Sequence, residues 1–205
     1  MEIIYLNEVD STQKYLIEKI KDNELAPPVC VWTEYQTDGI GSRNNKWIGK
    51  KGNLFFSFAY KKDNFKEIPL QSLSVYFGWI FKKTLNEIGS SVVMKWPNDI
   101  YLIEKKPVKI GGLITNIIKN CVVCGIGLNT FYSPHEEFGR LDINVKNDKI
   151  LKMFFFNLQK NYKWDSVIKE FGKEFEKYKS FFSINGELQE DGSLKINEKR
   201  IYSRR

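Results

Sequence analysis

The feature that most constrains the fold is a series of short apolar segments, each rich in β-branched and aromatic residues. Their length and composition are typical of β-strands, and turn-forming residues separate them. The expected strands cover residues 2–6, 29–35, 53–60, 92–96, 100–104, 113–118 and 121–126. Because they crowd into the first two thirds of the chain, we expect one central mixed sheet.

Segments with helical spacing of apolar residues lie between and after these strands. Ser11 can cap a first helix. Residues 70–89 read as a long amphipathic helix, and the Phe-rich residues 149–160 and 164–181 as two more. The sequence therefore predicts an α/β (α+β) fold, with a central mixed β-sheet and helices packed on it.

The end of the chain has a different character. Residues 184–205 contain short strand-like pieces separated by Asn185-Gly186 and Asp191-Gly192, which are both hairpin signals. We therefore expect a main domain over residues 1–182 and an abbreviated β segment over residues 183–205.

Composition narrows the class of protein. Three cysteines are too few for a disulfide scaffold, and no signal-peptide pattern or run of roughly 18 apolar residues occurs. We therefore expect a reduced, cytoplasmic protein with no membrane contact. The net charge of +7 leaves two interpretations open, a nucleic-acid-binding module and a solvated lysine-rich surface.

A polar, glycine-rich segment separates two of the strands at residues 36–52. Backbone N–H groups near Gly39 and Gly41 could cradle an anion, and Arg43 and Lys46 add positive charge. The segment matches neither the P-loop nor the dinucleotide-binding pattern. Connections of this length are usually functional or disordered, so an ordinary surface loop is the competing interpretation.

Lys95 stands at the end of an apolar strand, directly before the turn Pro97-Asn98-Asp99. A cation in that position could hold a carboxylate and an α-phosphate together while negative charge develops between them. Asn98 and Asp99 could orient the lysine or contact a nucleotide. The competing interpretation is that Lys95 reaches solvent and that the following residues form only a turn.

Two further features lie near residue 125. Gly125 and Gly127 would let a ligand approach the backbone at a strand end, and Asn129 supplies a donor and an acceptor; a simple strand-end turn is the alternative. Cys121 and Cys124 form a C-x-x-C pattern, but within a strand their side chains point to opposite faces. We therefore expect no metal or redox role for this pair.

The order of these motifs resembles that of the catalytic domain of biotin–protein ligases. The resemblance covers roughly residues 5–130, and the stretch from Lys95 to Asp99 is its most specific part. The matching stretches are Asp10-Ser11-Thr12-Gln13, Glu34-Tyr35-Gln36, Gly39-Ile40-Gly41-Ser42-Arg43-Asn44-Asn45-Lys46-Trp47, Asn53-Leu54-Phe55-Phe56-Ser57, Lys95-Trp96-Pro97-Asn98-Asp99, Lys109-Ile110-Gly111-Gly112-Leu113 and Gly125-Ile126-Gly127-Leu128-Asn129. The family's catalytic fold resembles that of class II aminoacyl-tRNA synthetases, which agrees with a central mixed sheet.

The resemblance implies an ATP-dependent ligase that uses biotin, ATP and Mg²⁺. It would form biotinyl-5′-AMP and then transfer biotin to a lysine of a biotin carboxyl carrier protein, a subunit of acetyl-CoA carboxylase. Lys95 would be the catalytic residue, touching the biotin carboxylate and the α-phosphate. The resemblance assigns no protein residue as a metal ligand and implies no nucleic-acid partner; edge-strand homodimers occur in the family.

The residues implied to bind substrates fall into two sets. The first set would bind biotin: Ser11, Thr12, Gln13, Gln36, Gly39, Ile40, Gly41, Ser42, Lys95 and Gly112. The second set would bind the nucleotide: Arg43, Asn44, Lys46, Trp47, Asn98, Asp99 and Asn129. The family often has arginines where this loop has Ile40 and Ser42, so we expect faster escape of the adenylate.

Two expectations concern the type of ligase. The catalytic pattern begins within the first dozen residues, which indicates the short, monofunctional type without a DNA-binding segment. A lipoate–protein ligase is the nearest alternative, because it resembles a biotin ligase in fold and chemistry. The run from Lys95 to Asp99 favours biotin.

Overall fold

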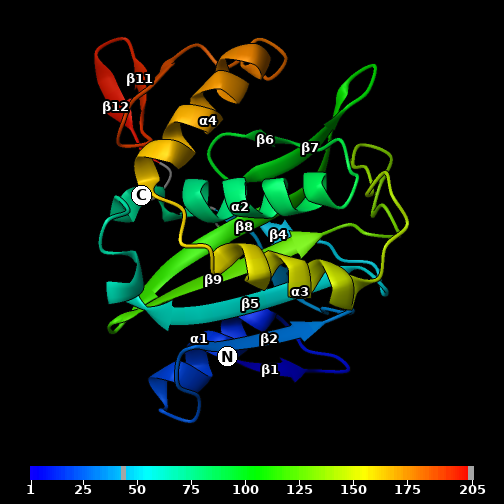
Figure 1. The fold of residues 1–205 in the computed structure, drawn as a ribbon. Helices are drawn as coiled ribbons and strands as arrows, with labels where there is room; N and C mark the ends of the chain where they lie inside the picture. Colours follow the sequence, from blue (N-terminus) through cyan, green and yellow to red (C-terminus); the bar gives the residue numbers. More distant parts are fainter. Residues whose placement is uncertain (43–44, 203–205) are drawn as a thin grey trace. The chain divides into compact units, whose positions relative to one another are not determined.

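The computed structural model describes residues 1–42 and 45–202. The chain divides into two compact units, whose elements are labelled in Figure 1. Unit 1 comprises Met1–Lys66 and Ile110–Leu141, and unit 2 comprises Glu67–Lys109 and Asp142–Arg205. Each unit is therefore assembled from two separate stretches of sequence. No helix within the described ranges is both long enough and apolar enough to cross a membrane.

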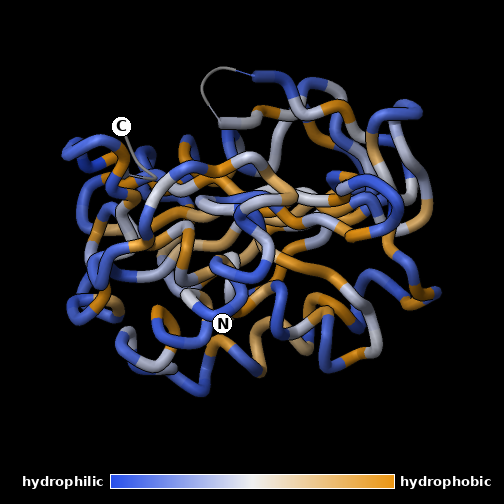
Figure 2. The backbone as a smooth tube through the Cα atoms, turned by 90° about the horizontal axis from the view of Figure 1, so that it is seen from above, coloured by the Kyte–Doolittle hydropathy of each residue, from blue (hydrophilic) through white to orange (hydrophobic). Residues whose placement is uncertain are grey.

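Unit 1 is built on strands that lie in the order β1-β2-β5-β9-β8. β1 and β2 are parallel, whereas each later pair is antiparallel, so the expected mixed sheet is confirmed. The bounds are β1 (Glu2–Tyr5), β2 (Val29–Thr33), β5 (Leu54–Lys61), β8 (Pro107–Ile118) and β9 (Cys121–Leu128). Figure 2 shows the pattern behind the prediction: apolar stretches (orange) alternate along the chain with hydrophilic ones (blue).

Helix α1 (Thr12–Lys21) packs on β2, β5 and β9 within unit 1. Ser11 caps it as expected: its backbone is extended, and its hydroxyl accepts a hydrogen bond from the Lys14 N–H at 3.4 Å. Leu16 and Ile20 are buried in a cluster with apolar residues of the strands. These two residues hold the later turns of α1 against the sheet.

The glycine-rich segment forms a small hairpin rather than an irregular loop. β3 (Gly39–Ile40) pairs antiparallel with β4 (Lys46–Trp47). Strands of two residues carry too little periodicity to be visible in a sequence. Arg43 and Asn44, which separate the two strands in sequence, lie outside the described residues.

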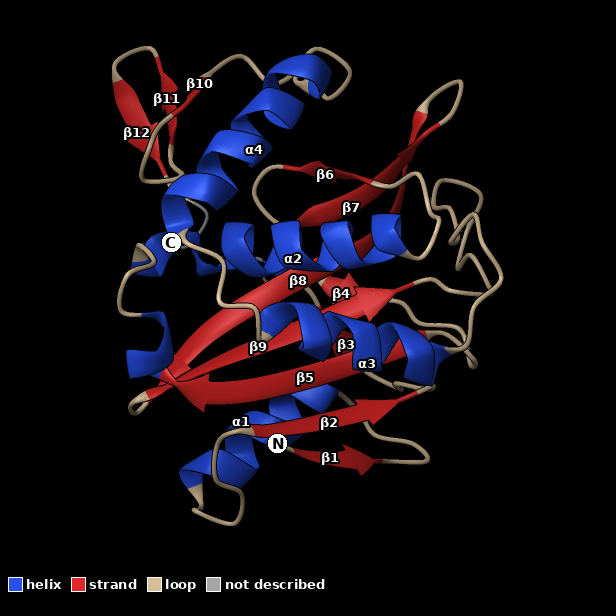
Figure 3. Cartoon of the chain, in the orientation of Figure 1, coloured by secondary structure: helices blue, strands red, loops and turns tan. Residues whose placement is uncertain are grey.

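Unit 2 contains a β-hairpin and three α-helices, drawn red and blue in Figure 3. The hairpin pairs β6 (Val93–Lys95) with β7 (Asp99–Ile103). The α-helices are α2 (Leu73–Glu87), α3 (Asn147–Leu158) and α4 (Trp164–Tyr178). The short 3-10 helix η3 (Leu70–Ser72) directly precedes α2. A second 3-10 helix, η2 (Lys62–Phe65), ends the first stretch of unit 1. α2 contacts α3, α4 and both strands of the hairpin, so it is the centre of unit 2.

The C-terminal strands form a small antiparallel sheet of β10 (Glu187–Leu188), β11 (Leu194–Ile196) and β12 (Lys199–Ile201). Asp191-Gly192 lies in the connection from β10 to β11, as expected. The expected hairpin at Asn185-Gly186 is wrong. The second turn is Asn197-Glu198, where both φ angles are positive, at 46° and 65°. Such turns need two positive φ angles, and Glu198 gives no sequence signal for one.

The largest difference from the expected strands is in β8, which begins at Pro107 rather than near residue 113. Gly111 and Gly112 depress the strand propensity of this region, so its first half is not recognisable locally. In the structure they pair with Leu128 and Gly127 of β9. Pairing with a partner strand overrides the weak local preference. The expected boundary between residues 182 and 183 stays a prediction.

Candidate functional site

A group of buried polar side chains surrounds the first turn of α1 in unit 1. Ser11, Thr12 and Gln13 are 1%, 3% and 2% exposed, and Gln36 is 8% exposed. Polar side chains are seldom buried unless they are hydrogen-bonded, so their partners define what the group can do.

Thr12 is the centre of this group. Its backbone N–H donates to Gln36 Oε1 at 2.8 Å, and its hydroxyl donates to the same oxygen at 3.0 Å. The Thr12 and Ser57 hydroxyls lie 2.9 Å apart. A Cβ added at Gly39 would meet Gln36 Nε2 at 2.8 Å. Gly39 therefore leaves room beside Gln36 Nε2, whereas Gln36 Oε1 already accepts two hydrogen bonds from Thr12.

Gln13 presents an acceptor with nothing bound to it. Its Nε2 donates to Asn116 Oδ1 at 3.0 Å, whereas its Oε1 is buried and has no hydrogen-bond partner among the described residues. A Cβ at Gly125 would lie 2.6 Å from that oxygen and 3.0 Å from Ser57 Oγ. An unpaired buried acceptor costs about 1–3 kcal/mol. A ligand N–H would satisfy it, and the absence of a side chain at Gly125 leaves room for the oxygen.

The hairpin of β3 and β4 contacts the sheet through Trp47. A Cβ at Gly127 would come within 2.6 Å of the Trp47 ring, so glycine lets the indole lie against β9. Gly112 is the partner of Gly127 across the β8–β9 pair. Two adjacent glycines therefore leave the sheet without side chains where the hairpin approaches it.

Asp38 ties the same hairpin to α1. Its carboxylate lies 2.6 Å from Lys14 Nζ and 3.4 Å from Lys46 Nζ. Hydrogen bonds from Lys14 and then Lys46 hold the pKa of Asp38 below its usual value. Lys46 was predicted to bind the nucleotide; its side chain is 82% exposed and so remains accessible.

Asn129 has a role within the protein that the sequence did not indicate. It is fully buried, its Oδ1 accepts from Asn53 Nδ2 at 3.3 Å, and its Nδ2 donates to Gly139 O at 3.0 Å. Asn53 Oδ1 in turn accepts the N–H groups of Phe131 and Tyr132, each at 3.0 Å. Asn129 thus holds the segment that follows β9, directly through its Nδ2 and indirectly through Asn53.

In unit 2, Lys95 ends β6 and Asp99 begins β7, and the two residues are direct partners across the hairpin. The peptide between Trp96 and Pro97 in the intervening turn is cis. The Asp99 carboxylate lies 2.6 Å from Lys109 Nζ, so this predicted nucleotide-contacting group already has a cationic partner. Lys95 is half-buried.

The cysteines offer no comparable site. All three are free and buried, and burial raises the pKa of the Cys124 and Cys30 thiols. A thiol that stays protonated is a poor nucleophile and a poor metal ligand. Across residues 1–42 and 45–202, no group of three or more His, Cys, Asp or Glu side chains is arranged to hold a metal ion.

Comparison with known proteins relates both candidate regions to one protein family. Residues 5–129, more than half of the chain, match the Biotin/lipoate A/B protein ligase family. The chain belongs to this family. The matched range contains the polar group at α1, the β3–β4 hairpin and the Lys95 hairpin, so the ligase family accounts for both candidate regions.

Proteins similar to this ligase-family chain differ in how much of the two chains the match covers. The structure of a biotin acetyl coenzyme A carboxylase synthetase from Helicobacter pylori, solved with bound biotinylated ATP, is 36% identical with a TM-score of 0.89 and covers 98% of this chain and 99% of that one. The bifunctional ligase/repressor BirA of Salmonella typhimurium is 30% identical over 136 residues, 63% of this chain. The match spans only 41% of the BirA chain.

The fold of the ligase family does not by itself identify the acid. A bipartite lipoate protein ligase from Thermoplasma acidophilum has a TM-score of 0.55 at 11% identity, and the match covers 92% of this chain and 99% of that one. At that identity the likeness concerns the fold alone. The distinction between biotin and lipoate therefore depends on the side chains of the pocket.

The structure of this ligase-family chain brings together Ser11, Thr12, Gln13 and Gln36, four of the residues predicted to bind biotin. No site role was predicted from the sequence for Ser57 or Asn116, the polar partners that β5 and β8 contribute. A single polar residue inside an apolar strand was the available signal in each case. We call Thr12, Gln13, Gln36, Ser57 and Gly125 the polar pocket.

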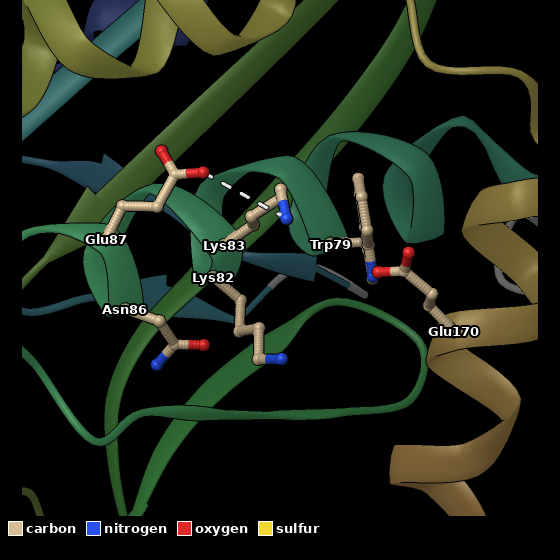
Figure 4. Close-up of a pocket in the computed structure, with 6 residues that line it drawn as sticks. All are labelled: Trp79, Lys82, Lys83, Asn86, Glu87 and Glu170. Atoms are coloured by element: carbon tan, nitrogen blue, oxygen red, sulfur yellow. Dashed lines mark ion pairs between the residues drawn. The ribbon is translucent and has the colours of Figure 1, made fainter.

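A separate hollow in unit 2 of the ligase-family chain contains none of the predicted residues (Figure 4). Its volume is about 280 Å³, and it is lined by Trp79, Lys82, Lys83, Asn86, Glu87 and Glu170. Its lysines are paired inside the protein: Lys83 lies 4.0 Å from Glu87, and Lys82 forms an ion pair with Glu174. With its lysines paired, this hollow is a weaker candidate than the polar pocket and the Lys95 hairpin.

Proposed function

We propose that this chain is a biotin–protein ligase. It forms biotinyl-5′-AMP from biotin and ATP and transfers biotin to a lysine of a biotin carboxyl carrier protein, a subunit of acetyl-CoA carboxylase. The observation that carries the proposal is the likeness, at 36% identity over nearly the whole chain, to the Helicobacter pylori synthetase with bound biotinylated ATP. The order of motifs around Lys95 supports the same activity.

The polar pocket suits the ureido head of biotin. That head has two N–H donors and one carbonyl acceptor, and Gln13 Oε1 is a buried acceptor without a partner. The Thr12 and Ser57 hydroxyls and the Gln36 amide supply further donors and acceptors nearby. The dithiolane ring of lipoate has no N–H groups and would leave Gln13 Oε1 unpaired. A site built to hydrogen-bond one substrate rejects an analogue that lacks the groups.

Lys95 would act in the first step. A biotin carboxylate oxygen attacks the α-phosphorus of ATP, the bond to the leaving oxygen breaks, and pyrophosphate departs. The lysine ammonium offsets the negative charge of the two reactants as they approach. In the second step the neutral amine of the acceptor lysine attacks the acyl carbon, AMP leaves, and the nitrogen loses its extra proton.

The proposal includes Mg²⁺ because the ion would bind together with ATP and neutralise the charge of its phosphates. In nucleotide sites it usually keeps phosphate and water oxygens together with one or two carboxylates. Asp99 is the carboxylate of the Lys95 hairpin that could serve as a ligand, and its oxygen lies 2.6 Å from Lys109 Nζ.

We also propose a cytoplasmic location for the protein. We further propose homodimers formed through the edge strand β1, on which Ile3 and Tyr5 are 45% and 48% exposed.

The test of the function is a mass-spectrometric assay for transfer to a purified biotin carboxyl carrier domain with ATP and Mg²⁺. One arm contains biotin and a second arm contains lipoate. We expect the mass increase of biotinylation on the acceptor lysine in the first arm alone. Transfer of lipoate with no transfer of biotin would contradict the proposal.

Replacing Lys95 with Ala tests the assignment of the catalytic residue. We expect pyrophosphate release to fall by about a hundredfold or more, because preorganised charge stabilisation at a reaction centre contributes on that scale. Biotin should still bind through the intact polar pocket, more weakly because the contact between Lys95 and the biotin carboxylate is lost. Near-normal pyrophosphate release by this variant would refute the role of Lys95.

A further inference from the structure

The hairpin register places an aromatic residue diagonally beside Lys95. Lys95 is opposite Asp99, and Val93 is opposite Tyr101. Directly opposed residues of an antiparallel pair share a face, and residues two apart on a strand also share it. Lys95 and Tyr101 therefore lie on one face of the β6–β7 hairpin, within reach of each other.

Two rings flank the Lys95 ammonium. Its Nζ lies 5.4 Å from the centroid of the Tyr101 ring and 5.5 Å from that of the Phe182 ring. The two rings are 5.0 Å apart, edge to face, at 64°. Burial, followed by the charge of Asp99, raises the pKa of Tyr101 to about 12. Tyr101 is therefore a neutral ring rather than a phenolate partner for the lysine.

The charge of Lys95 is left uncompensated. Among the ion pairs of the described residues, none joins Lys95 to a carboxylate. The nearest acidic residue across the hairpin, Asp99, pairs with Lys109 instead. Aromatic faces attract a cation without neutralising it. The ammonium is thus held in place while its charge stays available to an anion.

Phe182 reaches the hairpin from the segment that follows α4. Its N–H donates to Tyr178 O at 3.3 Å, and the Ile184 N–H donates back to Lys179 O at 2.9 Å. The chain beyond is anchored by two indole N–H groups: Trp96 donates to Gly192 O at 2.9 Å and Trp164 to Glu190 O at 2.8 Å. These hydrogen bonds fix the C-terminal segment within unit 2 on both sides of Phe182.

We propose that Tyr101 and Phe182 are positioning residues that clamp the Lys95 ammonium between two aromatic faces for adenylate formation. The proposal rests on the proposed catalytic role of Lys95. It assigns the C-terminal part of unit 2 a part in the reaction, because one of the two rings comes from beyond α4. The clamp restrains the flexible lysine side chain before substrates arrive, as preorganised charge requires.

The first experiment compares variants in a pyrophosphate-release assay at saturating ATP and biotin. We expect Phe182→Leu and Tyr101→Leu each to lower kcat by about twofold to fivefold, and the double variant by about tenfold or more. The KM for biotin should change little. Tyr101→Phe and Phe182→Tyr keep a ring and should retain most of the activity.

A matched control is Phe156→Leu on α3. The Phe156 ring is 58% exposed and lies 4.8 Å from Lys160 Nζ, so this variant removes a lysine–aromatic pair of the same kind elsewhere. It should leave kcat unchanged. A loss equal to that of Phe182→Leu would point to a general effect on folding and overturn the clamp.

The second experiment changes the charge distribution of the aromatic ring at position 182 without changing the shape of that ring. Phenylalanine with one, two or three ring fluorines is placed at position 182, which progressively weakens the negative ring face. We expect log kcat to fall stepwise with fluorination while the melting temperature stays constant. Equal rates across the series would overturn the proposal, because a merely structural role depends on ring size.

A measurement independent of activity separates the clamp from the proposed function. Reductive ¹³C-methylation of the lysines, with the Lys95 signal assigned by Lys95→Arg, reports ring currents from the flanking rings. The clamp predicts an upfield methyl signal that moves back in Phe182→Leu. If this signal is present but biotin does not stimulate pyrophosphate release, the clamp is supported and the ligase function is refuted. If the protein is active but the signal is absent, the ligase function is supported and the clamp is refuted.

Discussion

At the scale of single residues, the polar pocket depends on the absence of a side chain at position 125. A Cβ there would lie 2.6 Å from Gln13 Oε1 and 3.0 Å from Ser57 Oγ. Both atoms belong to fully buried side chains, so neither can move away into solvent. The space they border is therefore sensitive to the addition of a single methyl group.

Gly125→Ala should therefore weaken biotin binding by about tenfold or more and destabilise the protein by about 1–3 kcal/mol through overpacking. Isothermal titration with biotin and urea unfolding would measure the two effects. Gly172→Ala is the control: it lies within α4, where the added Cβ meets only Leu188 Cδ2 at 3.9 Å. It should bind biotin normally. Normal biotin affinity in Gly125→Ala would contradict the location of the pocket.

At the scale of elements, we expect the β3–β4 hairpin to influence how long the proposed adenylate stays bound. Ile40 of β3 is half-buried beside its partner Lys46, and Ser42 is exposed. Neither side chain offers the charged donors that the resemblance leads us to expect at these positions. Asp38 holds the base of the hairpin to α1 through Lys14, so the hairpin is anchored even though it lacks those donors.

Adding the missing charges should slow escape of biotinyl-adenylate. We expect Ile40→Arg with Ser42→Arg to reduce its release rate by about tenfold or more, since a hydrogen bond from a charged donor contributes about 1.5–3 kcal/mol. Release without acceptor can be followed by rapid filtration. Ile48→Arg, at a side chain 53% exposed, controls for added charge. Very slow release by the unmodified protein would refute the reasoning.

At the scale of the whole molecule, the C-terminal sheet is an integral part of unit 2. Trp96 and Trp164 are 9% and 8% exposed, and their indole N–H groups donate to Gly192 O and Glu190 O. Ser72 Oγ donates to Asp191 O at 2.5 Å. Three donors from separate stretches of unit 2 thus converge on one turn of the C-terminal sheet.

A chain that stops at residue 186 should be less stable, because two buried indole donors lose their acceptors at about 1–3 kcal/mol each. Burial of Leu194, which is 2% exposed, is lost as well. The midpoint of urea unfolding would measure the loss. Lys199→Ala, on an exposed residue of β12, should leave that midpoint unchanged. An equally stable truncated chain would show that the segment is dispensable.

The sequence by itself determined the local structure and the family. Apolar periodicity predicted the strands and helices, and the N-cap at Ser11 could be placed because its signal lies within a few residues. The order of motifs through Lys95 identified the family for the same reason: each motif is a contiguous stretch. Where a local signal was weak, as at β8 and at the Asn197-Glu198 turn, the prediction failed.

Only the tertiary structure decided which distant residues share a site. Ser57 and Asn116 join the first turn of α1 because β5 and β8 take their places in the sheet through strand pairing. Phe182 reaches Lys95 because the chain after α4 turns back onto the hairpin. Such contacts depend on pairing and packing between segments far apart in the sequence, and neither composition nor periodicity encodes them locally.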